Sequence, residues 1–184
     1  ILVKGNTVFK GYYNKPEETN EVLKDGWYYT GDEGYIVDGN YLVMTDRIKD
    51  LMKTSGGKYV SPQKLELLLS QSKYIDMLVV LGDNKKYVTA LIVPSFHSLE
   101  KYAKEMSISY ENNQQLIDNP IILDFYQKQI DECQKELTSY EKIVKFSLLP
   151  ETFSIDNKML TNTLKIKRKA ISEKYSELIE KMYK

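Results

Sequence analysis

The sequence has few of the residues on which many active sites and structural sites depend. Its 184 residues include one cysteine, Cys133, and one histidine, His97. A single cysteine cannot form a disulfide within the chain, and a lone histidine without a cysteine cluster cannot build the usual zinc site. No Ser-His-Asp set and no recognisable pair of catalytic carboxylates is present. We therefore expect no metal site and no catalytic triad in this chain.

Net charge and long apolar stretches are also missing. The 26 Lys and Arg residues are balanced by 26 Asp and Glu residues, so no overall basic field favours nucleic acid as a partner. The apolar runs are far shorter than the roughly 20 residues of a membrane-spanning helix. Neither a GxxxxGK[ST] nor a GxGxxG phosphate loop is present. The lone cysteine fits a reducing, cytoplasmic location, and any phosphate-binding site must be local.

The most informative group of charges lies between two strand-rich regions. It is the segment from Asp46 to Glu66, DRIKDLMKTSGGKYVSPQKLE, in which lysines, an arginine and acids surround Gly56-Gly57. A packed core does not need so many charges in such a link. The segment therefore predicts a negatively charged ligand and a joint between two bodies.

Hydrophobic periodicity predicts an α+β fold in two parts. Residues 1–45 are expected to form a small β-rich piece with a short helix after Asn14 and a hairpin turn at Asp38-Gly39. Residues 46–184 are expected to form a compact domain with a short, mostly antiparallel sheet flanked by helices. Strands are predicted at 77–81, 87–93 and 143–149, helices after Ser61 and at 99–106 and 121–137, a loop at 112–115, and one helix in the tail.

Two clusters could bind a nucleotide. Asp32 ends the string Tyr28-Tyr29-Thr30-Gly31-Asp32, where its carboxylate can accept two hydrogen bonds from a ribose diol. The alternative is an ordinary turn aspartate that bonds its own backbone. In the tail, LTNTLKIKRK places two hydroxyls before four cations at the start of a helix. The helix dipole favours acids there, so these cations indicate a function, unless they are simply a basic first turn.

Three motifs together resemble the C-terminal part of an adenylate-forming enzyme of the acyl-CoA synthetase superfamily. They are YYTGD at 28–32, DRIKDLMKTSGGKYVSPQKLE at 46–66 and LTNTLKIKRKAI at 160–171. The bacterial type of long-chain fatty acid–CoA ligase is the most similar group. The resemblance implies that residues 1–45 are the end of the enzyme's large adenylate-binding domain. Residues 46–184 would then be the enzyme's mobile C-terminal domain.

The resemblance also implies the reaction. ATP and a fatty acid would give an acyl-adenylate, and the thiol of CoA would then displace AMP. Mg²⁺ would be held mainly by ATP and by the missing N-terminal domain, so this chain alone is expected to be inactive. Palmitate-dependent release of AMP by the isolated chain would contradict that expectation.

The site residues follow from the same resemblance. Lys165 would be the catalytic lysine of adenylate formation, with Lys167 as the alternative, and Leu164 stands where relatives usually carry glycine. Asp32 and Arg47 would bind the ribose of the nucleotide. The remaining implied residues are the hinge Lys49 and, on the loop that lines the CoA tunnel, Lys53, Gly56 and Gly57.

Two other functions fit the same residues. One is another adenylate-forming enzyme, either a peptide-synthetase adenylation domain or a luciferase-like oxygenase. The other is a non-enzymatic module that binds a lipid or a protein partner. The tail combines a basic start with an apolar helical face, which also predicts peripheral contact with the inner face of a membrane.

Overall fold

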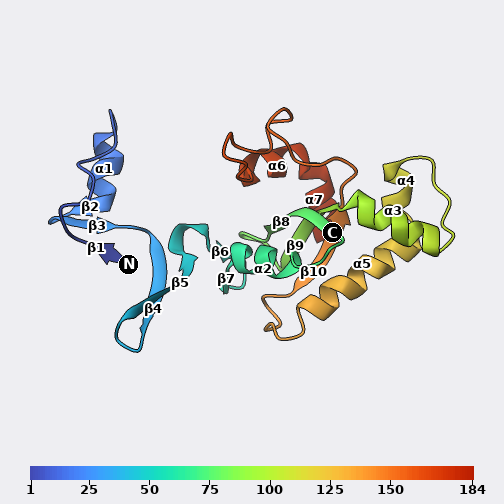
Figure 1. Ribbon diagram of the computed structural model, residues 1–184, viewed down its shortest axis with the longest axis horizontal. Helices are drawn as coiled ribbons and strands as arrows, with labels where there is room; N and C mark the ends of the chain where they lie inside the picture. The colour runs from blue at the N-terminus through green and yellow to red at the C-terminus, as the bar shows by residue number, and fades with distance from the viewer. The chain divides into compact units, whose positions relative to one another are not determined.

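The protein is described by a computed structural model that covers residues 1–45, 47–48 and 50–184 (Figure 1). The chain divides into two compact units, Ile1–Leu51 and Met52–Lys184. Each unit has its own sheets, and no sheet has strands from both. The mixture of helices and mostly antiparallel strands confirms the predicted α+β class.

The first unit contains two small antiparallel sheets and one helix. A three-stranded sheet has the order β1-β3-β2, and a hairpin pairs β4 with β5. Helix α1 begins after Lys15 and not after the predicted Asn14, because Asn14 has a φ of 53° and lies in the preceding turn. The elements are β1 (Leu2–Val3), α1 (Pro16–Val22), β2 (Leu23–Lys24), β3 (Trp27–Tyr29), β4 (Asp32–Val37), β5 (Tyr41–Arg47) and η1 (Ile48–Asp50).

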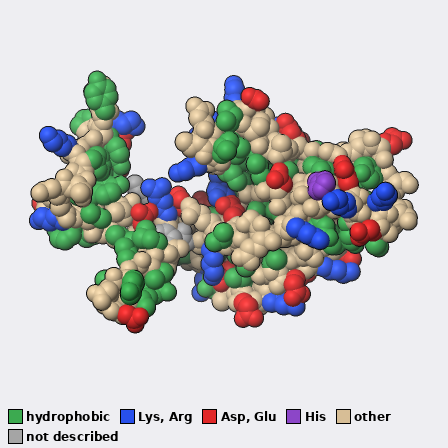
Figure 2. Space-filling model, viewed as in Figure 1, with side chains coloured by type: hydrophobic (Ala, Val, Ile, Leu, Met, Phe, Trp, Pro, Cys, Tyr) green, Lys and Arg blue, Asp and Glu red, His purple; other side chains and the backbone are tan. Residues whose placement is uncertain are grey.

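The β4–β5 hairpin turns where the sequence predicts. Asp38 and Gly39 have φ values of 52° and 71°, the positive values that a tight two-residue hairpin turn requires. Its apolar side chains are nevertheless exposed, Ile36 by 67% and Tyr41 by 68%. Hydrophobic side chains gather over this hairpin in Figure 2. None of the described residues in this unit is buried, so the unit has no core of its own.

The second unit is built around a three-stranded sheet with the order β10-β9-β8. Strand β8 (Ile75–Leu81) pairs antiparallel with β9 (Val88–Pro94), and β10 (Ile143–Leu148) pairs parallel with β9. All seven residues of β9 are buried, which is typical of a strand covered on both faces. Side chains alternate between two cores, so that Val80 joins one cluster and Val79 the other.

Helices cover both faces of this sheet (Figure 1). The first face carries α2 (Pro62–Leu69), α3 (Phe96–Glu105), α4 (Asn113–Ile117) and α5 (Pro120–Cys133). The second face carries α6 (Arg168–Lys174) and α7 (Ser176–Tyr183). A separate two-stranded hairpin is made by β6 (Met52–Lys53) and β7 (Tyr59–Val60).

Three details differ from the sequence-based expectations. The predicted loop at 112–115 opens into α4, because the Asn112 side chain caps the helix by accepting from the Gln115 N–H, and Leu116 is buried. The helix predicted for 121–137 ends at Cys133. The single tail helix is two helices, broken at Tyr175, whose ψ of 23° departs from helical geometry.

Candidate functional site

Asp32 and Arg47 face each other across the β4–β5 hairpin. The Nε of Arg47 lies 3.4 Å from Oδ1 of Asp32, and the two side chains are 55% and 31% exposed. The turn hydrogen bond is made by Thr30, whose hydroxyl accepts from the Asp32 N–H at 3.0 Å. The carboxylate of Asp32 is therefore not used to close its own turn, and its edge is accessible to solvent.

The Gly56-Gly57 loop joins β6 to β7. Thr54 is buried and closes the loop, because its N–H donates to the Lys58 carbonyl at 2.9 Å and its hydroxyl accepts from the Lys58 N–H at 3.2 Å. Gly57 has a φ of 78°, which favours glycine, and its N–H donates to the Thr54 carbonyl. Both glycines are exposed, so the tip of the loop presents backbone without side chains.

The base of this loop is fixed to the turn between β8 and β9. Lys53 donates its N–H to the Asp83 carboxylate at 3.0 Å, and its carbonyl accepts from the Asn84 N–H at 2.8 Å. The Ser55 N–H donates to the Lys85 carbonyl at 2.9 Å. The side chain of Lys53 is exposed and lies over the Tyr59 ring, with 5.6 Å between Nζ and the ring centroid. This loop is thus a rigid feature of the second unit.

Lys165 lies at the end of a second loop, between Leu160 and Ile166, which form an isolated antiparallel bridge. Its N–H donates to the Thr161 hydroxyl at 3.0 Å, and its carbonyl accepts from the Thr161 N–H at 2.8 Å. The preceding residue, Leu164, has a φ of 60° and is 69% exposed. That φ belongs to the left-handed region, in which glycine is favoured over leucine.

Lys165 and Lys167 are presented alike. Both side chains are exposed, whereas Ile166 between them packs against the second core. Among the described residues, neither ammonium has a carboxylate within 4.0 Å. Lys165 belongs to the loop itself, and Lys167 begins α6 and donates its N–H to the Met159 carbonyl. The geometry leaves both lysines available.

Arg168 has a different role from the lysines around it. Its guanidinium forms two contacts with Glu66 on α2, at 2.6 and 3.1 Å, and also donates to the Val80 carbonyl at 2.7 Å. This cation at the start of α6 is therefore neutralised, despite the helix dipole. Sequence reasoning missed Glu66, because its partner is 102 residues away and no local signal connects them.

A cavity of about 270 Å³ in the second unit is lined by residues that flank the two loops, and not by the loops themselves. Met52 contributes from β6, Asp83 from the turn between β8 and β9, and Arg168 from the start of α6. Ser172, Ile179 and Tyr183 complete much of the lining. The strands and helices around this cavity thus support both loops, each at a separate place.

The remaining sequence-based expectations concern the hinge and metals. Lys49, the predicted hinge residue, lies outside the described residues. His97 is exposed on α3, away from any described metal-ligand group. Across residues 1–45, 47–48 and 50–184, no group of three or more His, Cys, Asp or Glu could hold a metal ion. In that same part of the chain, no helix combines the length and apolarity needed to cross a bilayer.

Residues 49–184 match the family model described as the AMP-binding enzyme C-terminal domain. The chain belongs to this family. The match includes the Gly56-Gly57 loop, Glu66 and the Lys165 loop. It confirms the resemblance inferred from the three motifs.

Relatives extend the similarity to the whole chain. The sequence is 35% identical over 189 aligned residues to long-chain-fatty-acid–CoA ligase 5 of Rattus norvegicus, with 100% of this chain and 27% of the relative covered. It is 34% identical to the long-chain-fatty-acid–CoA ligase FadD15 of Mycobacterium tuberculosis, with 100% of this chain and 31% of that protein covered. The chain thus spans less than a third of the length of these relatives.

Solved structures show the same fold. The adenylation domain of a carboxylate reductase from Mycobacterium chelonae matches with a TM-score of 0.79 at 30% identity, covering 99% of this chain and 27% of that one. The A-PCP didomain of carboxylic acid reductase from Segniliparus rugosus, solved in complex with AMP, matches with a TM-score of 0.77 at 30% identity, covering 99% of this chain and 24% of that one.

Proposed function

We propose that this chain is the C-terminal part of an AMP-forming long-chain fatty acid–CoA ligase. The observation that carries the proposal is the exposed ammonium of Lys165 on a loop that is fixed at both ends, in a chain similar over its full length to proteins named long-chain fatty acid–CoA ligases. The whole enzyme would convert a fatty acid, ATP and CoA to acyl-CoA, AMP and pyrophosphate.

In the first half-reaction, a carboxylate oxygen of the fatty acid attacks the α-phosphorus of ATP, and the bond to pyrophosphate breaks. Asp32 would accept hydrogen bonds from the ribose hydroxyls, and Arg47 would reach the same sugar. The Lys165 ammonium would stabilise the charge that develops on the phosphoryl oxygens. Mg²⁺ would neutralise the ATP phosphates, and the side chains described here offer no carboxylate cluster to hold it.

In the second half-reaction, the CoA thiolate attacks the acyl carbonyl carbon, and AMP leaves with the bonding electrons. The Gly56-Gly57 loop would line the passage of the pantetheine arm, because backbone without side chains allows close approach. Lys53 at the base of this loop would lie near the entering cofactor. Lys165 and this loop occupy separate places on one unit, so the unit would turn about Lys49 between the two steps.

Lys165 provides the direct test. In the full-length enzyme, Lys165→Ala should lower palmitate-dependent exchange of pyrophosphate into ATP by about 100-fold or more, since the loss of one such electrostatic contact typically costs that much. Formation of acyl-CoA from supplied acyl-adenylate should be almost unchanged. Lys167→Ala is the matched control and should keep both steps. If only the Lys167 variant lost exchange, the lysine assignment would be wrong; if neither did, the proposed first half-reaction would fall.

A second candidate is an adenylation domain that delivers its product to a carrier domain. The specific observation is the TM-score of 0.79 to the carboxylate reductase adenylation domain. The distinguishing measurement is thioester formation in the presence of free CoA. A full-length protein that makes palmitoyl-adenylate but no palmitoyl-CoA would support this candidate and exclude the ligase.

Peripheral membrane contact, if it is used, would be electrostatic. The apolar residues Ile179 and Met182 of α7 are 8% and 5% exposed and belong to the second core, so they cannot insert into lipid. The exposed Lys165, Lys167 and Lys169 remain for anionic headgroups on the cytoplasmic leaflet. Co-sedimentation with phosphatidylserine vesicles should then fall steeply as salt rises. An absence of binding at low salt would remove the membrane from the proposal.

A further inference from the structure

The Lys165 loop is held from its two ends. Lys165 itself makes backbone hydrogen bonds to Thr161, and its ammonium has no carboxylate partner among the described side chains. The neighbouring Leu164 is in the left-handed region, which is strained for a residue other than glycine. A loop that contains such strain keeps its shape only if its surroundings determine it. The supports at its ends therefore decide where the ammonium is placed.

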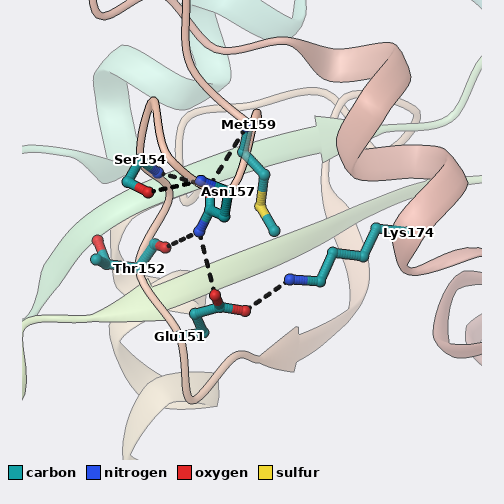
Figure 3. Close-up of polar contacts among 6 residues, drawn as sticks. All are labelled: Glu151, Thr152, Ser154, Asn157, Met159 and Lys174. Carbon is teal, nitrogen blue, oxygen red and sulfur yellow. Dashed lines mark hydrogen bonds and ion pairs between the residues drawn. The ribbon is translucent and has the colours of Figure 1, made fainter.

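The leading end is supported by Asn157 (Figure 3). The Asn157 side chain accepts from the Ser154 N–H at 2.9 Å and donates to the Thr152 carbonyl at 2.9 Å and to the Glu151 carboxylate at 3.2 Å. The Ser154 hydroxyl accepts from the Asn157 N–H at 3.1 Å. Lys174 on α6 reaches Glu151 at 2.6 Å. This segment is thereby fixed to α6 before the chain enters the Lys165 loop.

The trailing end is supported by the pair formed by Glu66 and Arg168. Arg168 lies three residues beyond Lys165 in the sequence. Glu66 accepts two hydrogen bonds from Arg168 and one from the Val80 N–H at 2.8 Å, while Arg168 donates to the Val80 carbonyl at 2.7 Å. Because β8 is an edge strand, the pair satisfies both outward backbone groups of Val80. The pair also connects α2 on one face of the sheet with α6 on the other.

Several features make this an orienting contact. A bidentate pair between arginine and carboxylate fixes direction as well as distance. Because a well-packed apolar pair often stabilises a fold as well as a buried ion pair does, stability alone does not account for these charges. The side chain of Glu66 is 18% exposed and that of Arg168 is 36% exposed, which leaves the contact partly shielded from water. Because Arg168 is only three residues from Lys165, the contact directly fixes the position of the backbone at that point.

We propose that Glu66 is a positioning residue for adenylate formation, acting on Lys165 through Arg168. This inference rests on the proposed role of Lys165. It assigns to Glu66 no contact with substrate. Its effect is to hold the trailing end of the Lys165 loop, so that the ammonium reaches the α-phosphate at the distance that charge stabilisation requires.

The test separates the two half-reactions in the full-length enzyme. Glu66→Gln keeps the shape of the side chain but removes its charge and one acceptor for Arg168. The rate of adenylate formation should fall by about 10- to 100-fold, the loss expected when a catalytic group is misplaced by about 1 Å. The KM for ATP and the rate of thioester formation from supplied acyl-adenylate should be nearly unchanged. Arg168→Lys, which keeps a charge but loses the bidentate contact, should behave in the same way.

The control is Glu141→Gln. Glu141 is also paired with α2, through Lys64 at 2.8 Å, but it lies in the turn before β10 and far in sequence from the Lys165 loop. Both half-reactions should be kept in this variant. If it lost adenylate formation as strongly as Glu66→Gln, general loosening of α2 would be the cause and the proposal would be wrong.

A double variant separates positioning from stability. Glu66→Gln combined with Arg168→Met removes both charges and relieves the unpaired guanidinium. If the pair only stabilises the fold, adenylate formation should recover together with the urea midpoint. If it positions Lys165, the midpoint should recover and adenylate formation should stay low. Recovery of both, or full activity in Glu66→Gln, would overturn the proposal. A wild-type enzyme without palmitate-dependent exchange would instead refute the proposed function itself.

Discussion

Two arginine–carboxylate pairs in the molecule are built in contrasting ways. Asp32 and Arg47 lie 3.4 Å apart, between Oδ1 and Nε, and their side chains are 31% and 55% exposed. Glu66 and Arg168 meet through two contacts, the shorter of 2.6 Å, and both also bind the backbone of Val80. The first pair lies on an exposed hairpin, and the second lies at the edge of a buried sheet.

The contrast indicates different uses of the same chemistry. Asp32 has a long contact and an exposed edge, so its carboxylate can exchange solvent for the hydroxyls of a ligand at low cost. The hydrogen-bonding groups of Glu66 and Arg168 already have protein partners, so a ligand would have to break strong contacts to reach them. We therefore expect mutation of the first pair to change binding, and mutation of the second to change stability and geometry.

The largest difference should appear in unfolding. Arg168→Met leaves the Glu66 carboxylate partly buried with one backbone donor, so the free energy of unfolding should fall by about 2 kcal/mol. Asp32→Asn should change it by less than about 0.5 kcal/mol, because an exposed ion pair contributes little. Urea unfolding of the 184-residue chain, followed by circular dichroism, measures both. Equal losses in the two variants would remove the contrast.

Nucleotide binding should respond in the opposite sense. In the full-length enzyme, Asp32→Asn should raise the KM for ATP by about tenfold, because the amide accepts hydrogen bonds through one oxygen and carries no charge. Its urea midpoint should match that of the wild type. Glu66→Gln provides the comparison, since it should leave the KM for ATP nearly unchanged. An Asp32→Asn variant with normal KM would return Asp32 to the role of an ordinary turn residue.

Sequence patterns predicted whatever depends on neighbours along the chain. The hairpin turn at Asp38-Gly39 and the cap of α2 at Ser61, whose hydroxyl accepts from the Lys64 N–H, were both expected from local residues, and both are confirmed. The buried runs of β8 and β9 were equally visible. The Glu66–Arg168 pair was not, because it depends on how a helix and a loop from opposite ends of the unit meet at one strand edge.

In the candidate site, too, some features depend on neighbours along the chain and others on contacts between distant residues. Motif order suggested Asp32, Arg47 and Lys165 as site residues, since each lies within a short recognisable string, and their roles stay predictions. What those strings could not reveal is the support of each residue. The break of the tail helix at Tyr175 and the capping of α4 by Asn112 were missed for a related reason. The Asn112 cap is a local contact, with the Gln115 N–H three residues on, but the polar run at 112–115 reads as a loop without the burial of Leu116.

Leu164 offers a smaller effect that tests the strain in the supported loop. Leu164→Gly should raise the free energy of unfolding by about 0.5–1 kcal/mol, because relief of the left-handed conformation outweighs the greater freedom of glycine in the unfolded chain. The side chain is 69% exposed, so little burial is lost. Asn162→Gly, in the same loop without a positive φ, should lower stability instead. If both variants lost stability, Leu164 would not be strained in the wild type, and the supports at the ends of the loop would not be holding it in a strained conformation.

The smallest effect concerns a third ion pair, Lys64 with Glu141, in which the lysine is 56% exposed and the carboxylate 16% exposed. The hydrogen bond from Lys64, and then that from the Thr138 hydroxyl, hold the pKa of Glu141 below its ordinary value of 4.5. A carboxylate with a lowered pKa stabilises the fold above its unfolded pKa, and that contribution disappears as the pH falls through the folded pKa. Glu141→Gln should therefore cost about 0.5–1 kcal/mol near neutral pH and nearly nothing in acid.

Urea unfolding at several pH values gives this difference directly, and Asp124→Asn is the matched control. Asp124 forms an exposed helical pair with Lys128, with exposures of 63% and 72%, so its substitution should change stability very little. A difference for Glu141→Gln that grew toward low pH would have the wrong sign for a stabilised carboxylate. It would also show that the contribution of an ion pair to the stability of this protein does not follow from how far the pair is buried.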